Sequence, residues 1–442
     1  MSGNVSAETT KPIPASEQKM GLWGTLFLWT AASLVTPSLM TGQMFIPDIA
    51  PLTAIVIVVC ASLVGTVALS AMAIIGTRTR LPTFVVARAT FGTSGAKLFA
   101  VMNIIILAGW GIIQGYLGGL ALHKFLLATT GIDNVVAAII ITQGLVMIIT
   151  LMGHTGIQKV ETVASILMLV LVLSVIYKLL AEHGYTELQN LPLSDTPSLT
   201  YAIVFDLVLA SAFSWMALPC DYNRYCRSVN VSAWGIGCGY LLGTVIAMTL
   251  GILVGSFTLL AGQPSSYDPA ELLSGNYAVI ASAVLFVSVL STNLFNLYSM
   301  SMSALSLGKS VRFVYVTLGF GLFCLAGSLL QELVMAGFFD WILFVGAAMI
   351  PSFAIILTDY YWVKKSTWSA TAQQANGAFN VPAIITYIIG AVFSLYFTYV
   401  TPLAFGATAL TFLVTALTYP VLIRLWHQLR STQRNATEET PL

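Results

Sequence analysis

Five small polar side chains recur at helical spacing along residues 286–305, which are otherwise apolar. They are Ser288, Ser291, Thr292, Asn296 and Ser299. Residues three or four apart share one face of a helix, so the five groups form one polar stripe. A polar group left unpaired in hydrocarbon costs several kcal/mol, so the stripe must meet another helix, an ion or a solute. Hydrogen bonding between membrane helices and a binding site are the two interpretations.

A tryptophan and a glutamine form a second candidate site. Trp110 and Gln114 are four residues apart, so they lie one turn apart on the same face of a helix. An indole is a flat stacking surface, and an amide both donates and accepts hydrogen bonds. A planar heterocycle needs both. The alternative is an aromatic core residue beside a satisfied amide. Glycines of the same segment favour a pocket: Gly109, Gly111, Gly115, Gly118 and Gly119.

These residues belong to a chain with the composition of a polytopic membrane protein. Of its 442 residues, 57% are hydrophobic and 8% are charged, whereas about 25% are charged in an ordinary soluble domain. The net charge is +1 and no basic cluster occurs outside short loops, so nucleic acid is not an expected partner. The five cysteines are scattered without a CxxC pair, which indicates neither a metal site nor a disulfide framework.

Twelve apolar runs are long enough to cross about 30 Å of hydrocarbon. They lie near residues 22–48, 51–76, 97–123, 134–153, 160–181, 202–223, 233–262, 276–305, 312–330, 333–358, 377–399 and 402–427. With a cytoplasmic N-terminus, this arrangement leaves only Lys124 and Lys178 of the 18 Lys and Arg residues outside. Because basic loops remain in the cytoplasm, we expect twelve transmembrane helices in the plasma (inner) membrane, with both termini cytoplasmic. The polar N-terminal segment lacks the apolar core of a signal peptide, so the first run should remain as a span.

Two of the runs contain residues that break helices. In the first run, Pro37 and Gly42 fall within Thr36–Gln43, and in the sixth, Pro219 lies near the inner end. One proline alone indicates only a bend. Breaks in corresponding helices of two halves are typical of transporters with inverted repeats. The expected segments are an N-terminal tail (1–20), two five-helix repeats (21–181 and 202–358), two peripheral helices (377–427) and a C-terminal tail (428–442).

The seventh run contains a ridge of small residues at four-residue spacing. These are Gly235, Gly239, Gly243, Ala247, Gly251 and Gly255. Small residues at this spacing let another helix backbone approach closely, so the ridge predicts a tight helix contact. A surface that slides during transport is the alternative.

Four motifs resemble the nucleobase:cation symporter family, which includes cytosine permease and the bacterial hydantoin transporter. The motifs are PTFVVARATFG (82–92), the WxxxQ of Trp110 and Gln114, PCDYNRYCR (219–227) and STNLFNLY (291–298), and the resemblance extends over essentially the full length. It implies the leucine-transporter-like fold, an all-α membrane protein with ten helices in two inverted repeats and broken helices 1 and 6. It also implies uptake of a heterocyclic base coupled to Na⁺ or H⁺, with no organic cofactor.

The resemblance assigns residues by position. Ser291 and Thr292 match the hydroxyls that bind the coupling sodium, whereas Ala32, Val35 and Ser288 match its backbone carbonyl ligands. The substrate residues are then Trp110, Gln114, Ser211, Ala212, Trp215 and Asn296. Ala212 falls where the family has an aromatic side chain that covers one face of the base. Trp215, three residues further along, would then replace this aromatic side chain through a shift in register.

Departures from the family pattern bear on the substrate. Leu107 stands where cytosine permease has a glutamine, and Gln114 follows the hydantoin-transporter pattern. We therefore expect a small planar nitrogen heterocycle, which includes nucleobases such as cytosine and related pyrimidines or vitamin precursors. Sodium is the favoured coupling ion. If protons drive uptake instead, Asp206 and Asp340 are candidates for a proton relay.

Other classes of function fit the sequence less well. An intramembrane enzyme would need catalytic residues at membrane depth, but the four histidines lie at loops or at the ends of runs and no HExxH occurs. Repeated acidic rings or filter-like glycine loops would indicate a channel, and neither is evident in the sequence. We expect a monomer in the lipid bilayer.

Overall fold

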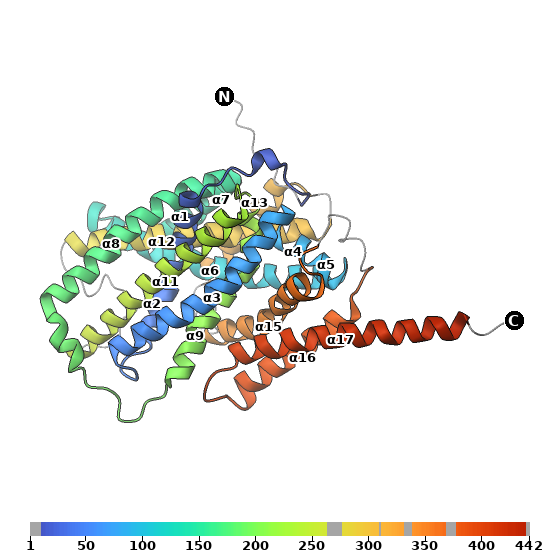
Figure 1. Ribbon diagram of the computed structural model, residues 1–442. Helices are drawn as coiled ribbons and strands as arrows, with labels where there is room; N and C mark the ends of the chain where they lie inside the picture. The colour runs from blue at the N-terminus through green and yellow to red at the C-terminus, as the bar shows by residue number, and fades with distance from the viewer. Residues whose placement is uncertain (1–9, 263–275, 309–310, 331–337, 368–376, 439–442) are drawn as a thin grey trace.

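The computed structural model describes residues 10–262, 276–308, 311–330, 338–367 and 377–438, and these are almost entirely helical (Figure 1). The helices of the first half are α1 (Leu22–Ser33), α2 (Thr36–Gln43), α3 (Pro51–Thr79), α4 (Thr83–Val86), α5 (Arg88–Phe91), α6 (Gly95–Thr130), α7 (Val135–Leu151) and α8 (Gly153–Gln189). Those of the second half are α9 (Tyr201–Ser214), α10 (Pro219–Asn223), α11 (Val229–Leu260), α12 (Asn276–Ser306), α13 (Phe313–Ser328), α15 (Phe338–Thr358), α16 (Val381–Leu395) and α17 (Thr408–Glu438).

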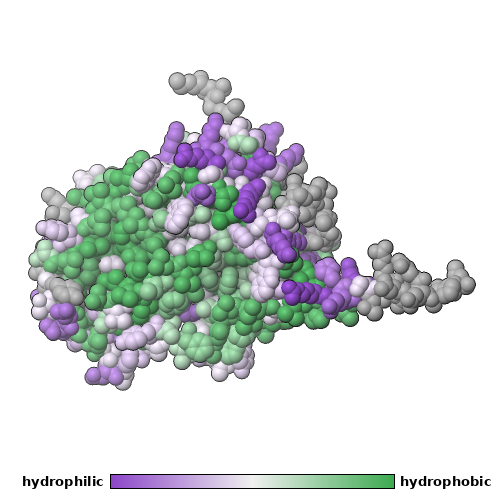
Figure 2. All heavy atoms as spheres, in the orientation of Figure 1, coloured by the Kyte–Doolittle hydropathy of each residue, from purple (hydrophilic) through white to green (hydrophobic). Residues whose placement is uncertain are grey.

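Helix length and apolar composition support the membrane assignment. Seven helices in the described part are long and apolar enough to cross a membrane, and α1 with α2 makes an eighth when the bent pair is counted as one span. Shorter apolar helices at 135–151, 201–217, 313–328 and 347–363 occupy the remaining predicted runs. Figure 2 shows a broad hydrophobic surface over α3, α8 and α11, where side chains such as Val67, Val170 and Leu242 are exposed. This surface suits lipid tails.

The first span is broken just before the stretch that the sequence indicated. Helix α1 ends at Ser33, Leu34 and Val35 leave the helical conformation, and α2 starts at Thr36 with its axis bent by 53°. Proline is favoured in the first turn of a helix, so Pro37 starts α2 instead of interrupting it. Its ring carries no N–H, so the Ser33 carbonyl receives no helical hydrogen bond from it. The predicted break is confirmed, but it lies at residues 34–35.

The sixth span is also discontinuous. Helix α9 ends at Ser214, residues Trp215–Ala217 form a 3₁₀ turn, and the short helix α10 begins at Pro219. As in the first span, the proline occupies the first turn after the break. The predicted interruption near Pro219 therefore lies at Trp215–Leu218.

Helix packing relates the two broken spans in the way that an inverted repeat requires. Helix α1 packs on α11, and α9 packs on α3, so the first span contacts the seventh as the sixth contacts the second. The glycines of α11 allow this approach: a Cβ on Gly239 would overlap the Leu26 carbonyl of α1, and one on Gly251 would overlap the Leu39 carbonyl of α2. The ridge of small residues is a packing surface for the broken span. The repeat boundaries at 21–181 and 202–358 remain a prediction.

Candidate functional site

The polar stripe of α12 faces the break of the first span. The Ser288 hydroxyl donates to the Leu34 carbonyl at 3.1 Å. One turn further along α12, the Thr292 hydroxyl donates to the Ser288 carbonyl at 3.0 Å. The first bond connects α12 to the break, next to Val35, whereas the second lies within α12. All five candidate cation residues are buried: Ala32, Val35, Ser288, Ser291 and Thr292.

A third helix contributes to this region through a carboxyl group. The Ser291 hydroxyl donates to Oε2 of Glu161 on α8, and the Glu161 side chain is fully buried. Glu161 was not among the predicted site residues, because the predicted fifth run begins at residue 160 and an acid at 161 then resembles a boundary residue. Helix α8 in fact starts at Gly153. At about 1.5 Å per residue, Glu161 lies roughly 12 Å inside the helix.

The groups around the break fit a hard cation. Hydroxyl, carbonyl and carboxylate oxygens are the ligands that such ions prefer. The carbonyl of Val35 already accepts from the backbone N–H groups of Ser38 and Leu39, but a carbonyl oxygen has two lone pairs and a hydroxyl that donates can still accept. The Oε1 atom of Glu161 is buried and has no hydrogen-bond partner among the described residues. The residues present can therefore hold a sodium ion.

A hydrogen bond between α6 and α12 sets the register of the substrate candidates. Asn103 Nδ2 donates to Ser303 Oγ at 2.9 Å. A Cβ on Gly118 would lie 3.2 Å from the Val289 side chain, so the two helices run antiparallel. Seven residues of a helix make about two turns and eleven make about three, so residues at these spacings lie on the same face.

Two pairs of candidate residues follow from this register. On α6, Trp110 and Gln114 follow Asn103 by seven and eleven residues. On α12, Asn296 and Thr292 precede Ser303 by the same seven and eleven residues. Counting turns therefore places Trp110 level with Asn296, and Gln114 level with Thr292.

The two amides of this region carry unpartnered polar atoms. Gln114 is 2% exposed and its Oε1 has no hydrogen-bond partner in the described structure, whereas Asn296 is 5% exposed and its Nδ2 has none. An acceptor and a donor are thus left available at neighbouring levels. The nearby amides are satisfied instead: Gln143 donates to the Gly111 carbonyl at 3.0 Å and accepts from Asn293 at 3.1 Å.

The candidates of the sixth span differ in their surroundings. Trp215 is half-buried in the break of the sixth span and meets Phe295 and Trp29 edge-on, with ring centroids 6.0 and 6.4 Å away. Ala212 is fully buried against Gly65 of α3, where it supports helix packing. Ser211 is half-buried on the same helix. Trp215 is therefore the aromatic candidate at this break.

The inner end of the stripe forms hydrogen bonds between helices. Ser299 Oγ donates to Asp221 Oδ2 of α10 at 2.6 Å, and the Thr83 N–H donates to Asp221 Oδ1 at 2.8 Å. Asn223 Oδ1 accepts from Trp29 Nε1 at 2.8 Å. The PCDYNRYCR motif thus connects the inner half of the sixth span to α1, α4 and α12. The interpretation of the stripe as interhelical hydrogen bonding therefore holds at its inner end, and the binding-site interpretation of its outer part remains a prediction.

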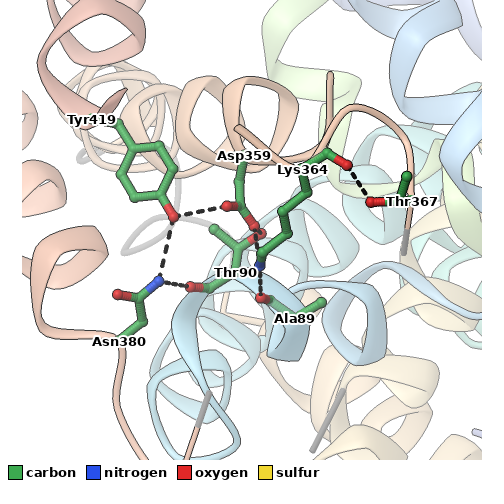
Figure 3. Close-up of polar contacts among 7 residues, drawn as sticks. All are labelled: Ala89, Thr90, Asp359, Lys364, Thr367, Asn380 and Tyr419. Carbon is green, nitrogen blue, oxygen red and sulfur yellow. Dashed lines mark hydrogen bonds and ion pairs between the residues drawn. The ribbon is translucent and has the colours of Figure 1, made fainter. Parts of the chain in front are cut away.

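The acids considered for a proton relay have other environments. Asp206 accepts from the backbone N–H groups of Thr408 and Ala409, both at 3.0 Å, so it caps α17. The side chain of Asp340 lies outside the described residues. The acid Asp359, which the sequence analysis did not consider, forms an ion pair with Lys364 at 2.7 Å (Figure 3).

Asp359 belongs to a polar cluster that involves the PTFVVARATFG motif. Thr90 of this motif donates to Asp359 at 2.9 Å, and Tyr419 of α17 donates to it at 2.8 Å (Figure 3). Asn380 donates to the Thr90 carbonyl at 2.6 Å. The motif therefore anchors the loop between α3 and α6 to the last three spans.

A pocket lies beside the cation residues. Its wall includes Leu34, Val35 and Ser288 near the break, with Met168 and Val172 of α8 opposite. The lining is apolar except for Thr36 and Ser288, and none of the substrate candidates belongs to it. The pocket therefore does not identify the heterocycle site.

Comparison with known proteins identifies the family. Residues 12–422 match the family model described as a permease for cytosine/purines, uracil, thiamine and allantoin. The chain belongs to this family. It is 24% identical to the purine-cytosine permease fcyB of Emericella nidulans over 82% of this chain and 74% of that protein. Identity to the putative purine-cytosine permease YxlA of Bacillus subtilis is 26%, over 87% of this chain and 85% of that protein.

Solved structures show the same fold. Mhp1, a nucleobase-cation-symport-1 family transporter in a closed conformation with bromovinylhydantoin bound, superposes with a TM-score of 0.82 at 17% identity, over 96% of both chains. The inward-facing conformation of Mhp1 gives 0.77 at 18% identity, over 98% of this chain and 97% of that one. A Na⁺-coupled sialic acid symporter gives a TM-score of 0.64 at 12% identity, over 92% of this chain and 89% of that one. The predictions of a leucine-transporter-like, all-helical membrane protein and of a transporter instead of an enzyme are confirmed.

Proposed function

We propose that this permease is a secondary active symporter that carries a small planar nitrogen heterocycle together with Na⁺ across the plasma membrane. One observation carries the proposal: the candidate residues for the ion and for the substrate lie on adjacent turns of α12. Ser288 contacts the break of α1, and Asn296 lies level with Trp110 of α6. A ligand in either proposed site therefore acts on α12.

The substrate site has the chemistry that a nucleobase requires. Trp110 provides a flat surface for stacking, and the ring of Trp215 covers the other face. The unpartnered Gln114 Oε1 accepts from a ring N–H, and the unpartnered Asn296 Nδ2 donates to a ring carbonyl or nitrogen. Ser211 and Ala212 flank Trp215 on the α9 side. The purine-cytosine permeases among the relatives and the hydantoin of the Mhp1 complex support this substrate class.

The ion site lies at the broken span. The hydroxyls of Ser291 and Thr292 and the carbonyls of Ala32, Val35 and Ser288 hold the sodium ion. Carbonyls at the C-terminal end of α1 carry partial negative charge, which favours a cation there. When bound, the ion supplies positive charge that stabilises the contact of α1 with α12. The Na⁺-coupled sialic acid symporter of the same fold supports this choice of ion. We further propose that the protein acts as a monomer.

Uptake into proteoliposomes tests the proposal. The purified protein is reconstituted, and uptake of labelled cytosine, uracil and hydantoin is measured with an inward Na⁺ gradient, with a pH gradient at equal Na⁺, and with neither. We expect the Na⁺ gradient to drive accumulation of at least one of these compounds. Accumulation driven only by the pH gradient would show that the protein is a proton-coupled symporter, which is the alternative function. Uptake of none of the heterocycles would refute the substrate class.

A further inference from the structure

Glu161 of α8 is a buried carboxyl group to which the proposed function assigns no role. Its side chain has 0% exposure. Oε2 accepts a hydrogen bond from Ser291, whereas Oε1 is buried without a hydrogen-bond partner among the described residues. Such a group is expensive to bury, since an ionised carboxylate away from water needs a paired charge. It therefore requires an explanation.

The face of α8 that carries Glu161 packs on the break of the first span. Ala164 and Met168 follow Glu161 by three and seven residues, so the three side chains share a helix face. Ala164 and Met168 form one buried cluster with Ala31 and Leu34, which lie at the end of α1 and in the break. Glu161 thus points toward the region where α1, α8 and α12 meet.

Among the described residues, no ion pair joins a basic side chain to Glu161. The ion pairs found in the described part of the chain, His123–Asp133 and Lys364–Asp359, do not involve Glu161. Within that part, its one polar contact is the hydroxyl of Ser291, a residue proposed to bind sodium. Burial without a paired charge favours the neutral, protonated carboxyl group, unless a bound cation supplies the positive charge.

We infer that Glu161 supplies a carboxylate oxygen to the cation site, so that the coupling ion is bound by a charged ligand from α8 as well as by the neutral oxygens of α1 and α12. This inference rests on the proposed function. Oε1 is the free oxygen that binds the cation, and Ser291 holds the carboxylate in place through Oε2. One carboxylate and one monovalent ion make the buried site neutral, whereas a divalent ion would leave it positively charged.

Thermal unfolding of the purified protein tests this inference without a transport assay. The unfolding midpoint is measured against NaCl concentration, with choline chloride holding the ionic strength constant, because a bound ion raises the midpoint according to its dissociation constant. For the wild type we expect a saturable rise with Na⁺. In Glu161→Gln the half-maximal Na⁺ concentration should increase by about 10- to 100-fold, as expected for loss of a group that binds or supports a metal. Without Na⁺, Glu161→Gln should be at least as stable as the wild type, because an uncompensated charge is removed.

Two further variants make the result decisive. Glu161→Asp keeps the charge but withdraws the oxygen by one methylene, so it should weaken Na⁺ binding even if Glu161→Gln does not fold. Asp206→Asn is the matched control, since it removes a buried carboxylate that accepts from the backbone N–H groups of Thr408 and Ala409 and has no contact with the cation residues among the hydrogen bonds described. It should lower the midpoint without changing the half-maximal Na⁺ concentration.

The possible outcomes separate this inference from the proposed function. A wild-type half-maximal Na⁺ concentration in both Glu161 variants would overturn the role of Glu161 while leaving sodium coupling intact. If Na⁺ does not stabilise the wild type, the sodium site itself is refuted.

Discussion

Replacing Trp110 tests the substrate site most directly. Trp110 lies level with Asn296 in the register of α6 against α12, and it is half-buried. If the heterocycle stacks on the indole, Trp110→Ala removes one stacking face, which is worth about 1–3 kcal/mol for a base on an aromatic side chain. This corresponds to roughly a tenfold to hundredfold loss of affinity. Trp110→Phe keeps a smaller ring and should lose only part of the affinity.

Trp110 is a cleaner position for this test than Trp215. Trp215 meets Trp29, Tyr240 and Phe295 edge-on, so its removal also disturbs a packed aromatic cluster. The matched control for Trp110 is Trp23→Ala, because Trp23 is 68% exposed at the start of α1. Its removal should leave affinity unchanged.

The assay is a thermal-shift titration of purified variants with heterocycles chosen from a screen of pyrimidines, purines and hydantoins, at saturating Na⁺. A ligand bound to the folded state raises the unfolding midpoint, so the titration yields relative affinities. The unfolding profile without ligand reports whether each variant is folded. If folded Trp110→Ala bound every heterocycle as tightly as the wild type, the stacking role would be wrong and Trp110 would be a core residue.

Three further predictions concern the substrate edge, the ion and the topology. Gln114→Leu keeps the volume but leaves the polar edge of the ring unpaired, so it should change the ranking of heterocycles in the same titration instead of weakening all equally; a uniform loss would argue against edge recognition. Thr292→Ala removes one ligand oxygen and should reduce Na⁺ stimulation of uptake more than it reduces folded yield; an unchanged Na⁺ titration would exclude this ligand. A cysteine introduced at Arg312 should react with a membrane-impermeant reagent only after cells are opened, because the loop is predicted to be cytoplasmic; labelling of intact cells would refute the topology.

The spans were predictable because hydrophobic length and charge distribution are local properties of the sequence. All twelve predicted runs contain a described helix. The position of the first break was less accurate, since Pro37 was interpreted as the interruption and in fact starts α2. A proline that lacks an N–H and has a fixed φ is compatible with the first turn of a helix as well as with a break. Sequence alone does not distinguish the two positions.

The site was only partly predictable because its contacts join residues that are distant along the chain. The spacing of Ser288, Ser291 and Thr292 identified a polar face, but the partner of that face depends on helix packing. Glu161 is 130 residues from Ser291 in the sequence, and no periodic pattern connects them. Ala212 illustrates the same limit: the motif alignment places it beside the site, and only the structure shows that its side chain packs closely on Gly65 of α3.

The arrangement along α12 gives a physical reason for coupling. From Ser288 to Ser303 the helix first contacts the break of α1 and the Glu161 carboxyl, then presents Asn296, and then forms the Ser299–Asp221 and Asn103–Ser303 hydrogen bonds. Ion and substrate would therefore both act on a short segment of one helix, and an ion that fixes this segment lowers the cost of ordering it for the substrate. Coupling between two binding sites is reciprocal, so the substrate must strengthen ion binding by the same factor. The inner hydrogen bonds hold the rest of α12 to α6 and α10. In the proposed mechanism, the part of the helix that responds to ligands is therefore limited to the turns around Ser291 and Asn296.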